Sequence, residues 1–255
     1  MTLGITVLGP TVIRAAGLRI DLARSMERAL LVRLAVAGGH PVLDGDLHRD
    51  LWTRPGRSEP ARLRVLVSRT RASLGPHGHH LERACGGYRL AGEATDLCSV
   101  RTLTRYADAA ARHGRPDEVV AATTAALDHW TGPALADLRT FPFAEAEGRR
   151  LDEHHLDLTI RRLDAQLHLD AAQAPVGELG ALATRHPQHE HIRSLLAHAL
   201  YRAGRQADAL HELAQLRRHL AETLGLDPTP SVAAMEVRML RHDPTLAAAS
   251  VRRAG

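Results

Sequence analysis

Residues 54–75 read RPGRSEPARLRVLVSRTRASLG, a stretch rich in arginine. It holds six arginines against one acid, Glu59. In its second half, side chains suited to a core recur at the spacing of one helical face, at Leu63, Val67, Thr70 and Leu74. The stretch therefore predicts a helix that buries a narrow stripe.

The opposite face of this helix carries small side chains. At about 100° per residue, Val65, Ser68 and Ala72 lie opposite the stripe. Arginines flank that outer face in two pairs, Arg62 with Arg69 and Arg64 with Arg71. The pattern fits either a solvated basic surface helix or a helix that presents small residues and two rows of arginine to a polyanion.

Composition narrows the possible chemistry. All 33 basic residues are arginine, which excludes a P-loop lysine and a Schiff-base lysine from these 255 residues. The two cysteines, Cys85 and Cys98, have no metal-ligand spacing, so we expect a reduced protein with small, buried thiols. The start, MTLGITVLG, does not resemble a signal peptide, and no apolar run is long enough to span a membrane. We expect a soluble protein of the cytoplasm, associated with the nucleoid and not with a membrane.

Charge is distributed unevenly along the chain. Residues 1–95 carry 14 arginines and 8 acidic residues, whereas the remaining residues carry 19 arginines and 21 acidic residues. A nucleic acid, if bound, would therefore meet the N-terminal part. Only seven residues are aromatic, which disfavours stacking on single-stranded bases and favours duplex DNA.

The first 95 residues predict a small mixed α/β domain. Turn residues and apolar alternation indicate three short strands, a helix from Ser25 as its cap to about Ala37, a second helix, the arginine helix and a β-hairpin around Gly86-Gly87. The strands are expected at 4–8, 11–14 and 18–20, and the second helix at 46–52. Strands, three helices and a hairpin are the order of a winged helix-turn-helix, whose third helix enters the major groove.

From Thr95 to about Pro244 the pattern is helical nearly throughout. Residues 106–127 and 196–216 resemble each other, each with an apolar helix, a Gly-Arg turn and a second helix. A third, less regular unit runs from 163 to 183. This is typical of tetratricopeptide-like helix pairs. The predicted fold class is mainly α with a small β part: an N-terminal winged helix-turn-helix followed by an all-α tetratricopeptide-like domain.

Several motifs resemble a known family. VSRTRASLG (67–75) and GGYRL (86–90) are similar to the end of an OmpR-type winged helix. Four further segments resemble a bacterial transcriptional activator domain: WTGPALADL (130–138), PFAEAEGRRLDE (142–153), ALYRAGRQADAL (199–210) and LAETLGLDPTPSVAAMEVRMLRHDP (220–244). In this order the motifs identify the chain, over roughly residues 3–244, as similar to the small form of the Streptomyces antibiotic regulatory protein family, which lacks the ATPase module of the large forms.

The resemblance implies a division of the chain. Residues 1–94 would form the DNA-binding domain, residues 95–245 the bacterial transcriptional activator domain, and residues 246–255 a disordered tail.

The resemblance also implies site residues. Arg69 corresponds to the arginine that reads bases in the major groove, and Arg71 to a backbone contact. Other expected DNA contacts on the same helix are Arg62, Arg64, Val65 and Ser68. In the wing, relatives usually have an arginine where this chain has Ala84, so the neighbouring Arg83 is the candidate contact. Arg54, Arg57 and Glu59, in the loop before the helix, are candidate contacts of the RNA polymerase sigma subunit, or else belong to a plain solvent loop.

The function implied is that of a sequence-specific transcriptional activator of a secondary-metabolite (antibiotic) gene cluster. Its expected partners are promoter DNA with direct repeats near the −35 element, RNA polymerase holoenzyme including sigma, and a second copy bound head-to-tail on DNA. The alternative is a helical-repeat adaptor for protein interactions with a vestigial winged helix.

An enzyme is a third and weaker possibility. Asp152-Glu153-His154-His155 occupies the polar face of an amphipathic helix and does not predict a catalytic site. Clusters at His77, His79 and His80, and at His186, His189 and His191, arise easily in a chain with 17 histidines. We expect no catalytic residues, no metal and no cofactor.

Overall fold

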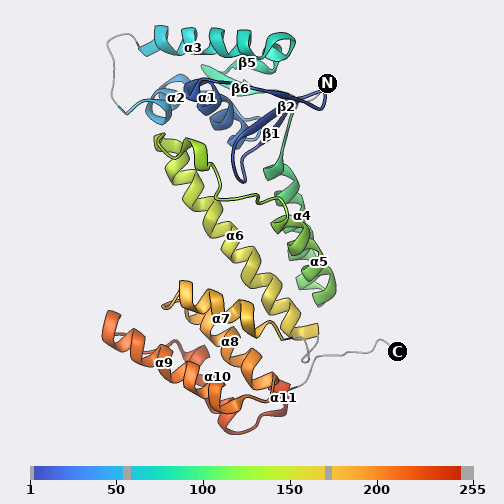
Figure 1. The fold of residues 1–255 in the computed structure, drawn as a ribbon, viewed down its shortest axis with the longest axis vertical. Coiled ribbons are helices and arrows are strands. Elements are labelled where there is room, and N and C mark those ends of the chain that lie inside the picture. Colours follow the sequence, from blue (N-terminus) through green and yellow to red (C-terminus); the bar gives the residue numbers. More distant parts are fainter. Residues whose placement is uncertain (1–2, 54–58, 170–173, 248–255) are drawn as a thin grey trace. The chain divides into compact units, whose positions relative to one another are not determined.

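The computed structural model describes residues 3–53, 59–169 and 174–247. The chain divides into two compact units: unit 1 contains residues 1–105 and 125–157, and unit 2 contains residues 106–124 and 158–255. The predicted fold class, mainly α with a small β part, is confirmed. The helices of both units are labelled in Figure 1.

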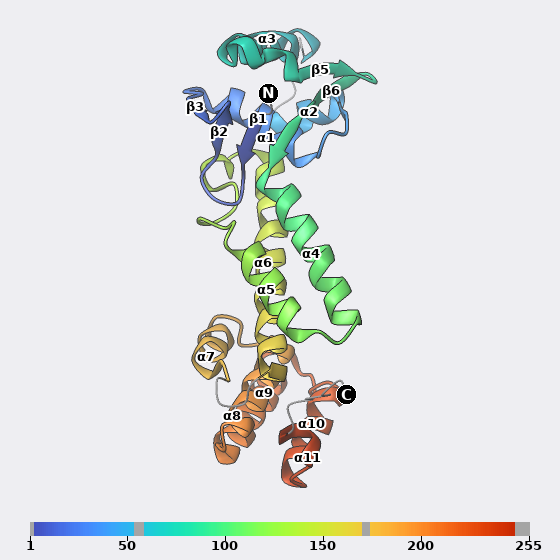
Figure 2. The same cartoon turned by 90° about the vertical axis from the view of Figure 1, so that its right-hand side faces the viewer.

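Unit 1 contains two small sheets (Figure 2). The first has the strand order β3-β2-β1-β7, in which β1 pairs with β2 antiparallel and with β7 parallel. The second has the order β4-β6-β5. The strands are β1 Leu3–Thr6, β2 Val12–Ala15, β3 Leu18–Ile20, β4 Val42–Leu43, β5 Leu81–Ala84, β6 Gly87–Leu90 and β7 Glu93–Thr95. The first strand was predicted to reach residue 8 but ends at Thr6, because the next two backbone N–H groups donate to a side chain instead of a strand.

Three helices pack together beside these sheets: α1 Ser25–Val36, α2 Asp44–Leu51 and α3 Glu59–Ser73. Leu30, Leu31 and Leu34 of α1 are fully buried, and α1 contacts both α2 and α3. The prediction that Ser25 caps α1 is wrong, since Ser25 is its first helical residue and the extended Arg24 holds the cap position without a side-chain hydrogen bond. The second helix begins at Asp44, two residues earlier than predicted.

The predicted hairpin is present as β5 and β6. Its two loop residues, Cys85 and Gly86, both have positive φ, as a two-residue type I′ turn requires. The next residue, Gly87, is needed for close approach, because a Cβ there would lie 1.9 Å from the carbonyl oxygen of Val42 on β4. The 3-10 helix η1, Gly75–His80, joins α3 to this hairpin.

Two aspartates from later in the chain bind the turn between β1 and β2. The Asp96 carboxylate accepts hydrogen bonds from the backbone N–H groups of Val7 (2.8 Å) and Leu8 (2.9 Å). Asp137 accepts from the N–H (3.1 Å) and hydroxyl (2.9 Å) of Thr11. Burial raises the pKa of the Asp96 carboxyl, and its backbone N–H donors oppose that shift. The β1–β2 turn is thus held by side chains that lie outside the first 95 residues.

The remaining elements are helical. They are α4 Asp96–Arg112, α5 Pro116–Leu127, η2 Ala136–Leu138, α6 Pro142–Leu169, α7 Val176–Arg185, α8 Glu190–Arg202, α9 Gln206–Leu224, α10 Pro230–Leu240 and α11 Pro244–Ala247. In unit 2, α8 contacts α7, α9, α10 and α11, so it is the central helix of that group. Its Ile192 and Ala199 are fully buried, as is Leu216 of α9.

The two segments predicted to resemble each other do share a turn. Gly114 and Gly204 have φ of 66° and 76°. The N–H of the following arginine donates to a carbonyl five residues back in each case, Arg115 to Ala110 (3.0 Å) and Arg205 to Leu200 (2.9 Å). This is the Schellman arrangement that closes a helix before its partner begins.

The compact units do not follow the predicted division at residue 94. Residues 125–157 cluster with the N-terminal region, because η2 and the chain before it bond to the β1–β2 turn. The N–H of Thr131 donates to Leu8 (2.8 Å), and that of Leu135 to Val7 (3.0 Å). Within the predicted tail, Leu246 of α11 is buried, and residues 248–255 lie outside the described residues. The domain boundaries stay predictions.

We predict that Asp96→Ala lowers the free energy of unfolding of the N-terminal unit by about 2–3 kcal/mol, because it removes a charged acceptor from buried backbone N–H groups. Urea unfolding of the full chain would measure the loss. Asp128→Ala, at an exposed position in the same unit, is the matched control and should change stability by less than about 0.5 kcal/mol. Equal stabilities for the two variants would contradict the role given to Asp96.

Candidate nucleic-acid interface

Helix α3 is seated by the stripe that its sequence predicts. Leu63, Val67 and Leu74 are at most 2% exposed, and Leu66, which the pattern did not assign to the core, is 7% exposed. Thr70 is fully buried, and its hydroxyl donates to the carbonyl of Leu66 at 2.9 Å. The hydroxyl is therefore satisfied inside the helix, which explains how a threonine is accommodated at a core position.

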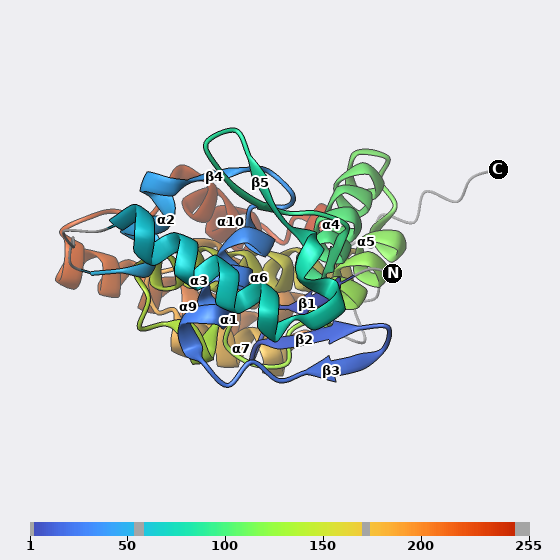
Figure 3. The ribbon, with the colours of Figure 1, turned by 90° about the horizontal axis from the view of Figure 1, so that it is seen from above.

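The opposite face of α3 is open within unit 1. Val65 is 49% exposed, and Ser68 and Ala72 are exposed as well. The four helix arginines, Arg62, Arg64, Arg69 and Arg71, are all exposed. Seen from above, α3 lies in front of α1, and no other described element of unit 1 covers it (Figure 3). A helix with one buried face and one bare, arginine-flanked face can enter a groove of a duplex.

Arg62 and Arg69 border one shallow hollow beside α3. The hollow is lined also by Trp52 and Val65, and by Met26 at the start of α1. The guanidinium carbon of Arg62 lies 4.9 Å from the centre of the Trp52 ring, and this ring is partly exposed. For Arg69, the described residues provide no ion-pair partner.

Arg71 has a second role that the sequence did not indicate. Its Nε and Nη2 donate to the carbonyl oxygen of Leu81, at 3.0 and 2.6 Å. Leu81 is the first residue of β5, so Arg71 ties α3 to the start of the hairpin. The guanidinium has five N–H donors, and the bonds to Leu81 leave others for a phosphate.

Glu27 anchors the C-terminal end of α3 from α1. It is only 2% exposed, and its carboxylate accepts hydrogen bonds from the Ser73 hydroxyl (2.8 Å) and from Arg24 (3.2 Å). Sequence reasoning missed this contact. The only signal in the sequence is an acidic residue, Glu27, in the first turn of a helix. Acidic residues are common at that position because they complement the helix dipole, so this one did not indicate a contact with α3.

In the hairpin, Arg83 is held by α2. It donates to both carboxylate oxygens of Asp44, at 2.6 and 2.8 Å, and lies over the Tyr88 ring at 4.7 Å. The hydrogen bond to Asp44 raises the pKa of Arg83 above its ordinary value. The structure therefore places the candidate wing contact on the exposed surface with a protein acceptor already bound. Arg89 pairs with Glu82 on the neighbouring strand (2.8 Å).

The candidate polymerase contacts are only partly covered by the structure. Arg54 and Arg57 lie outside the described residues, and of Glu59 only the backbone, as the first residue of α3, is described. Whether these three residues meet a partner stays a prediction.

The histidine clusters do not form a metal site in the described part of the chain. No group of three His, Cys, Asp or Glu side chains with metal-binding geometry occurs there. His79 and His80 instead pack ring against ring at 4.2 Å, and His80 bonds to the carbonyl of Ala91 (2.7 Å). Among the described helices, none combines the length and apolar character needed to cross a membrane.

Comparisons with known proteins agree with this architecture. The family model for the bacterial transcriptional activator domain matches residues 95–240. Regulatory protein AfsR of Streptomyces griseus is 37% identical over 245 residues, which are 95% of this chain and 25% of AfsR. The structure of Mycobacterium tuberculosis EmbR in complex with a low affinity phosphopeptide superposes with a TM-score of 0.86 at 30% identity, over 96% of this chain and 68% of that one.

The match also extends over nearly the whole of a relative of similar length. Regulatory protein DnrI of Streptomyces peucetius is 30% identical over 252 residues, covering 94% of this chain and 93% of DnrI. The chain thus spans about a quarter of AfsR but almost all of DnrI. The predicted resemblance is confirmed: the chain belongs to the Streptomyces antibiotic regulatory protein family, which is a family of transcriptional regulators and not of enzymes.

Proposed function

We propose that the protein is a sequence-specific DNA-binding transcriptional activator that inserts α3 into the major groove of promoter DNA. One observation carries the proposal: α3 buries its inner stripe, anchors its end through Glu27 and Ser73, and leaves its arginine-flanked outer face bare. Arg69 is the base-reading residue, because a guanidinium can bond to both the O6 and N7 atoms of guanine. Arg62, Arg64, Val65, Ser68 and Arg71 complete the contact, with Arg83 in the wing.

The finer proposal concerns the target and the partners. Two copies bind direct repeats near the −35 element of a secondary-metabolite gene cluster, head-to-tail, and recruit RNA polymerase holoenzyme through the region of residues 54–59. The relatives named as regulatory proteins support the regulatory role on which this finer proposal builds. Head-to-tail binding follows from direct repeats, because such repeats relate the two copies by translation along the duplex and not by a two-fold axis.

One observation favours the alternative of a protein-interaction adaptor. Two of the proposed DNA contacts, Arg71 and Arg83, have acceptors within the protein. DNA binding must therefore use the remaining donors of Arg71 and must replace or share the Asp44 contact of Arg83. DNase footprinting on the promoters beside its own gene, with and without holoenzyme and across a salt series, separates the two functions. Protection of spaced direct repeats, strengthened by holoenzyme, supports the activator; no protection at low salt supports the adaptor.

We predict that Arg69→Ala removes specific binding at a cost of about 1–3 kcal/mol, because the base contact is lost while phosphate contacts remain. Competition between the target duplex and an unrelated duplex would measure the ratio of affinities. Arg14→Ala, at an exposed position on β2, changes net charge equally and serves as control. An unchanged footprint for Arg69→Ala would refute the assignment of the base-reading residue.

We predict that Arg71→Ala weakens binding to all duplexes and reduces the slope of log affinity against log salt by about 0.9, the value for one phosphate contact. It should also lower stability, since the Leu81 carbonyl loses its two donors. Arg71→Lys keeps the charge but not the fork, so it should retain more of the salt slope than Arg71→Ala. Equal slopes for the wild type and Arg71→Ala would leave Arg71 with a purely structural role.

We predict that Asp44→Asn strengthens DNA binding several-fold by releasing Arg83. Because removal of any acid near DNA raises affinity, the decisive measurement is a double-mutant cycle with Arg83→Gln. If Arg83 contacts DNA, the gain from Asp44→Asn should largely disappear when Arg83 is absent. The same gain in both backgrounds would mean that Arg83 does not reach the duplex.

A further inference from the structure

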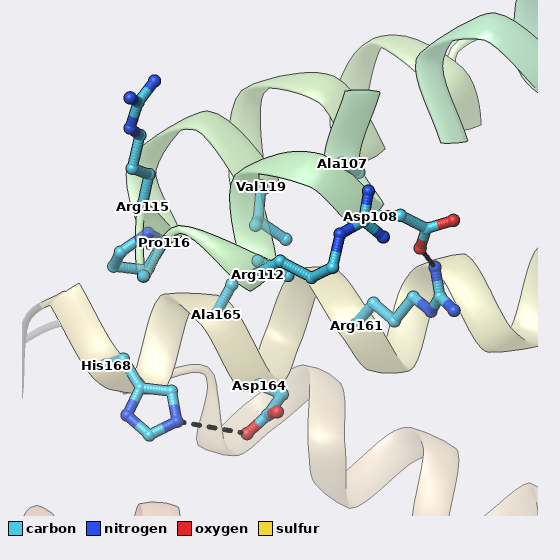
Figure 4. A pocket seen from close by; sticks show the side chains of 12 residues that line it. Ala107, Asp108, Arg112, Arg115, Pro116, Val119, Arg161, Asp164, Ala165 and His168 are labelled. Atoms are coloured by element: carbon cyan, nitrogen blue, oxygen red, sulfur yellow. Dashed lines mark hydrogen bonds and ion pairs between the residues drawn. The ribbon is translucent and has the colours of Figure 1, made fainter. Parts of the chain in front are cut away.

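A hollow in unit 2 is lined by none of the residues proposed to touch DNA. It has a volume of about 570 Å³ and is lined by the last turns of α4, the start of α5 and the last third of α6. Figure 4 shows its lining side chains. Its volume is within the range of roughly 300–1,000 Å³ that is usual for sites of small organic molecules.

The floor of the hollow is apolar and made of small residues. Ala107, Val119 and Ala165 come from the three helices and are 2%, 7% and 7% exposed. Ala111 and Gly114, on the α4 side, are also too small to fill the space. The hollow therefore exists because three helices meet through side chains that leave their junction unfilled. Such a floor favours an apolar group on its surface.

The rim of the hollow is charged, and most of its charges are already paired. Arg161 bonds to Asp108 across α6 and α4. Arg115 pairs with Glu118 at 3.0 Å, and in Figure 4 its side chain points away from the other lining residues. His168 lies 3.7 Å from Asp164. Of the arginines that line the hollow, Arg112 is not part of any of these pairs.

Arg112 is the rim cation without an acceptor in the described chain. It stands in the last turn of α4, where it is exposed, and it forms no ion pair or hydrogen bond with another described side chain. In Figure 4 its side chain extends toward Asp108. The two acids of the rim, Asp108 and Asp164, would repel a highly charged anion such as a phosphate dianion. A ligand with a single negative charge, which Arg112 can pair, fits this arrangement of rim charges.

We propose that this hollow binds a small amphipathic monocarboxylate. The apolar body of the ligand lies on the floor formed by Ala107, Val119 and Ala165, and its carboxylate accepts hydrogen bonds from Arg112. A guanidinium and a carboxylate form two parallel N–H···O bonds, which fixes the orientation of the ligand as well as its charge. The proposal does not depend on how α3 binds DNA.

The test uses the full chain with octanoate as the probe, and octan-1-ol and octylamine as probes of matched length. Methyl NMR of the valine and alanine side chains would follow Val119 and Ala165 during titration. We expect octanoate to shift these two signals saturably, and the alcohol and the amine to bind at least tenfold more weakly, because neither can accept from Arg112 as a carboxylate does. No shift with octanoate, or equal affinities for the three probes, would overturn the proposal.

Two variants locate the site. Arg112→Gln should weaken octanoate binding about tenfold, whereas Arg218→Gln on the exposed face of α9 should leave it unchanged. Ala111→Leu places a large side chain at an exposed helical position of the lining, so it should abolish binding without unfolding the helix. Backbone amide spectra would verify that each variant is folded. Wild-type affinity in both Arg112→Gln and Ala111→Leu would place the probe elsewhere and refute the site.

Discussion

The buried carboxylate of Glu27 is the contact on which the presentation of α3 depends. A carboxylate that is only 2% exposed needs hydrogen-bond donors. Here the donors are the hydroxyl of Ser73, at the end of α3, and the guanidinium of Arg24. Removal of either partner would leave one of the two buried carboxylate oxygens without its donor, a penalty of about 1–3 kcal/mol. The apolar stripe decides which face of α3 turns inward. The bond from Ser73 adds a directional contact near the C-terminal end of the helix, and it acts together with the bonds from Arg71 to Leu81 to hold α3 in place.

An interaction could be predicted from the sequence only when its two partners are close together along the chain. The phase of α3 is a local property, so the spacing of Leu63, Val67 and Leu74 predicted the buried and bare faces correctly. The bond from Ser73 to Glu27 joins residues 46 positions apart, and the bond from Leu8 to Asp96 joins residues 88 apart. The spacing of apolar residues along the chain does not indicate pairs that are so far apart. The misplaced end of the first strand has the same origin, because the next backbone N–H groups donate to a carboxylate that only the folded chain brings near.

The arginines of unit 1 differ in how ready they are for a ligand. Arg69 stands beside a hollow with no ion-pair partner among the described residues, whereas Arg83 is bound to both oxygens of Asp44. A cation that already has an acceptor gains less from a phosphate, because it exchanges one partner for another. Affinity would then arise mainly from α3, and the wing would adjust it. This ordering was invisible in the sequence, where all these residues are simply arginine in a basic segment.

The binding of the β1–β2 turn by Asp96 and Asp137 limits how freely this chain can be combined with its relatives. N–H groups of the turn donate to Asp96 of α4 and Asp137 of η2. The carbonyl groups of Val7 and Leu8 accept from the N–H groups of Leu135 and Thr131, respectively. A hybrid that joins the first 94 residues to the helices of another family member would keep the donors and acceptors of the turn but exchange all their partners. Compatibility of such a hybrid would be decided at positions 96, 131, 135 and 137, far in sequence from α3.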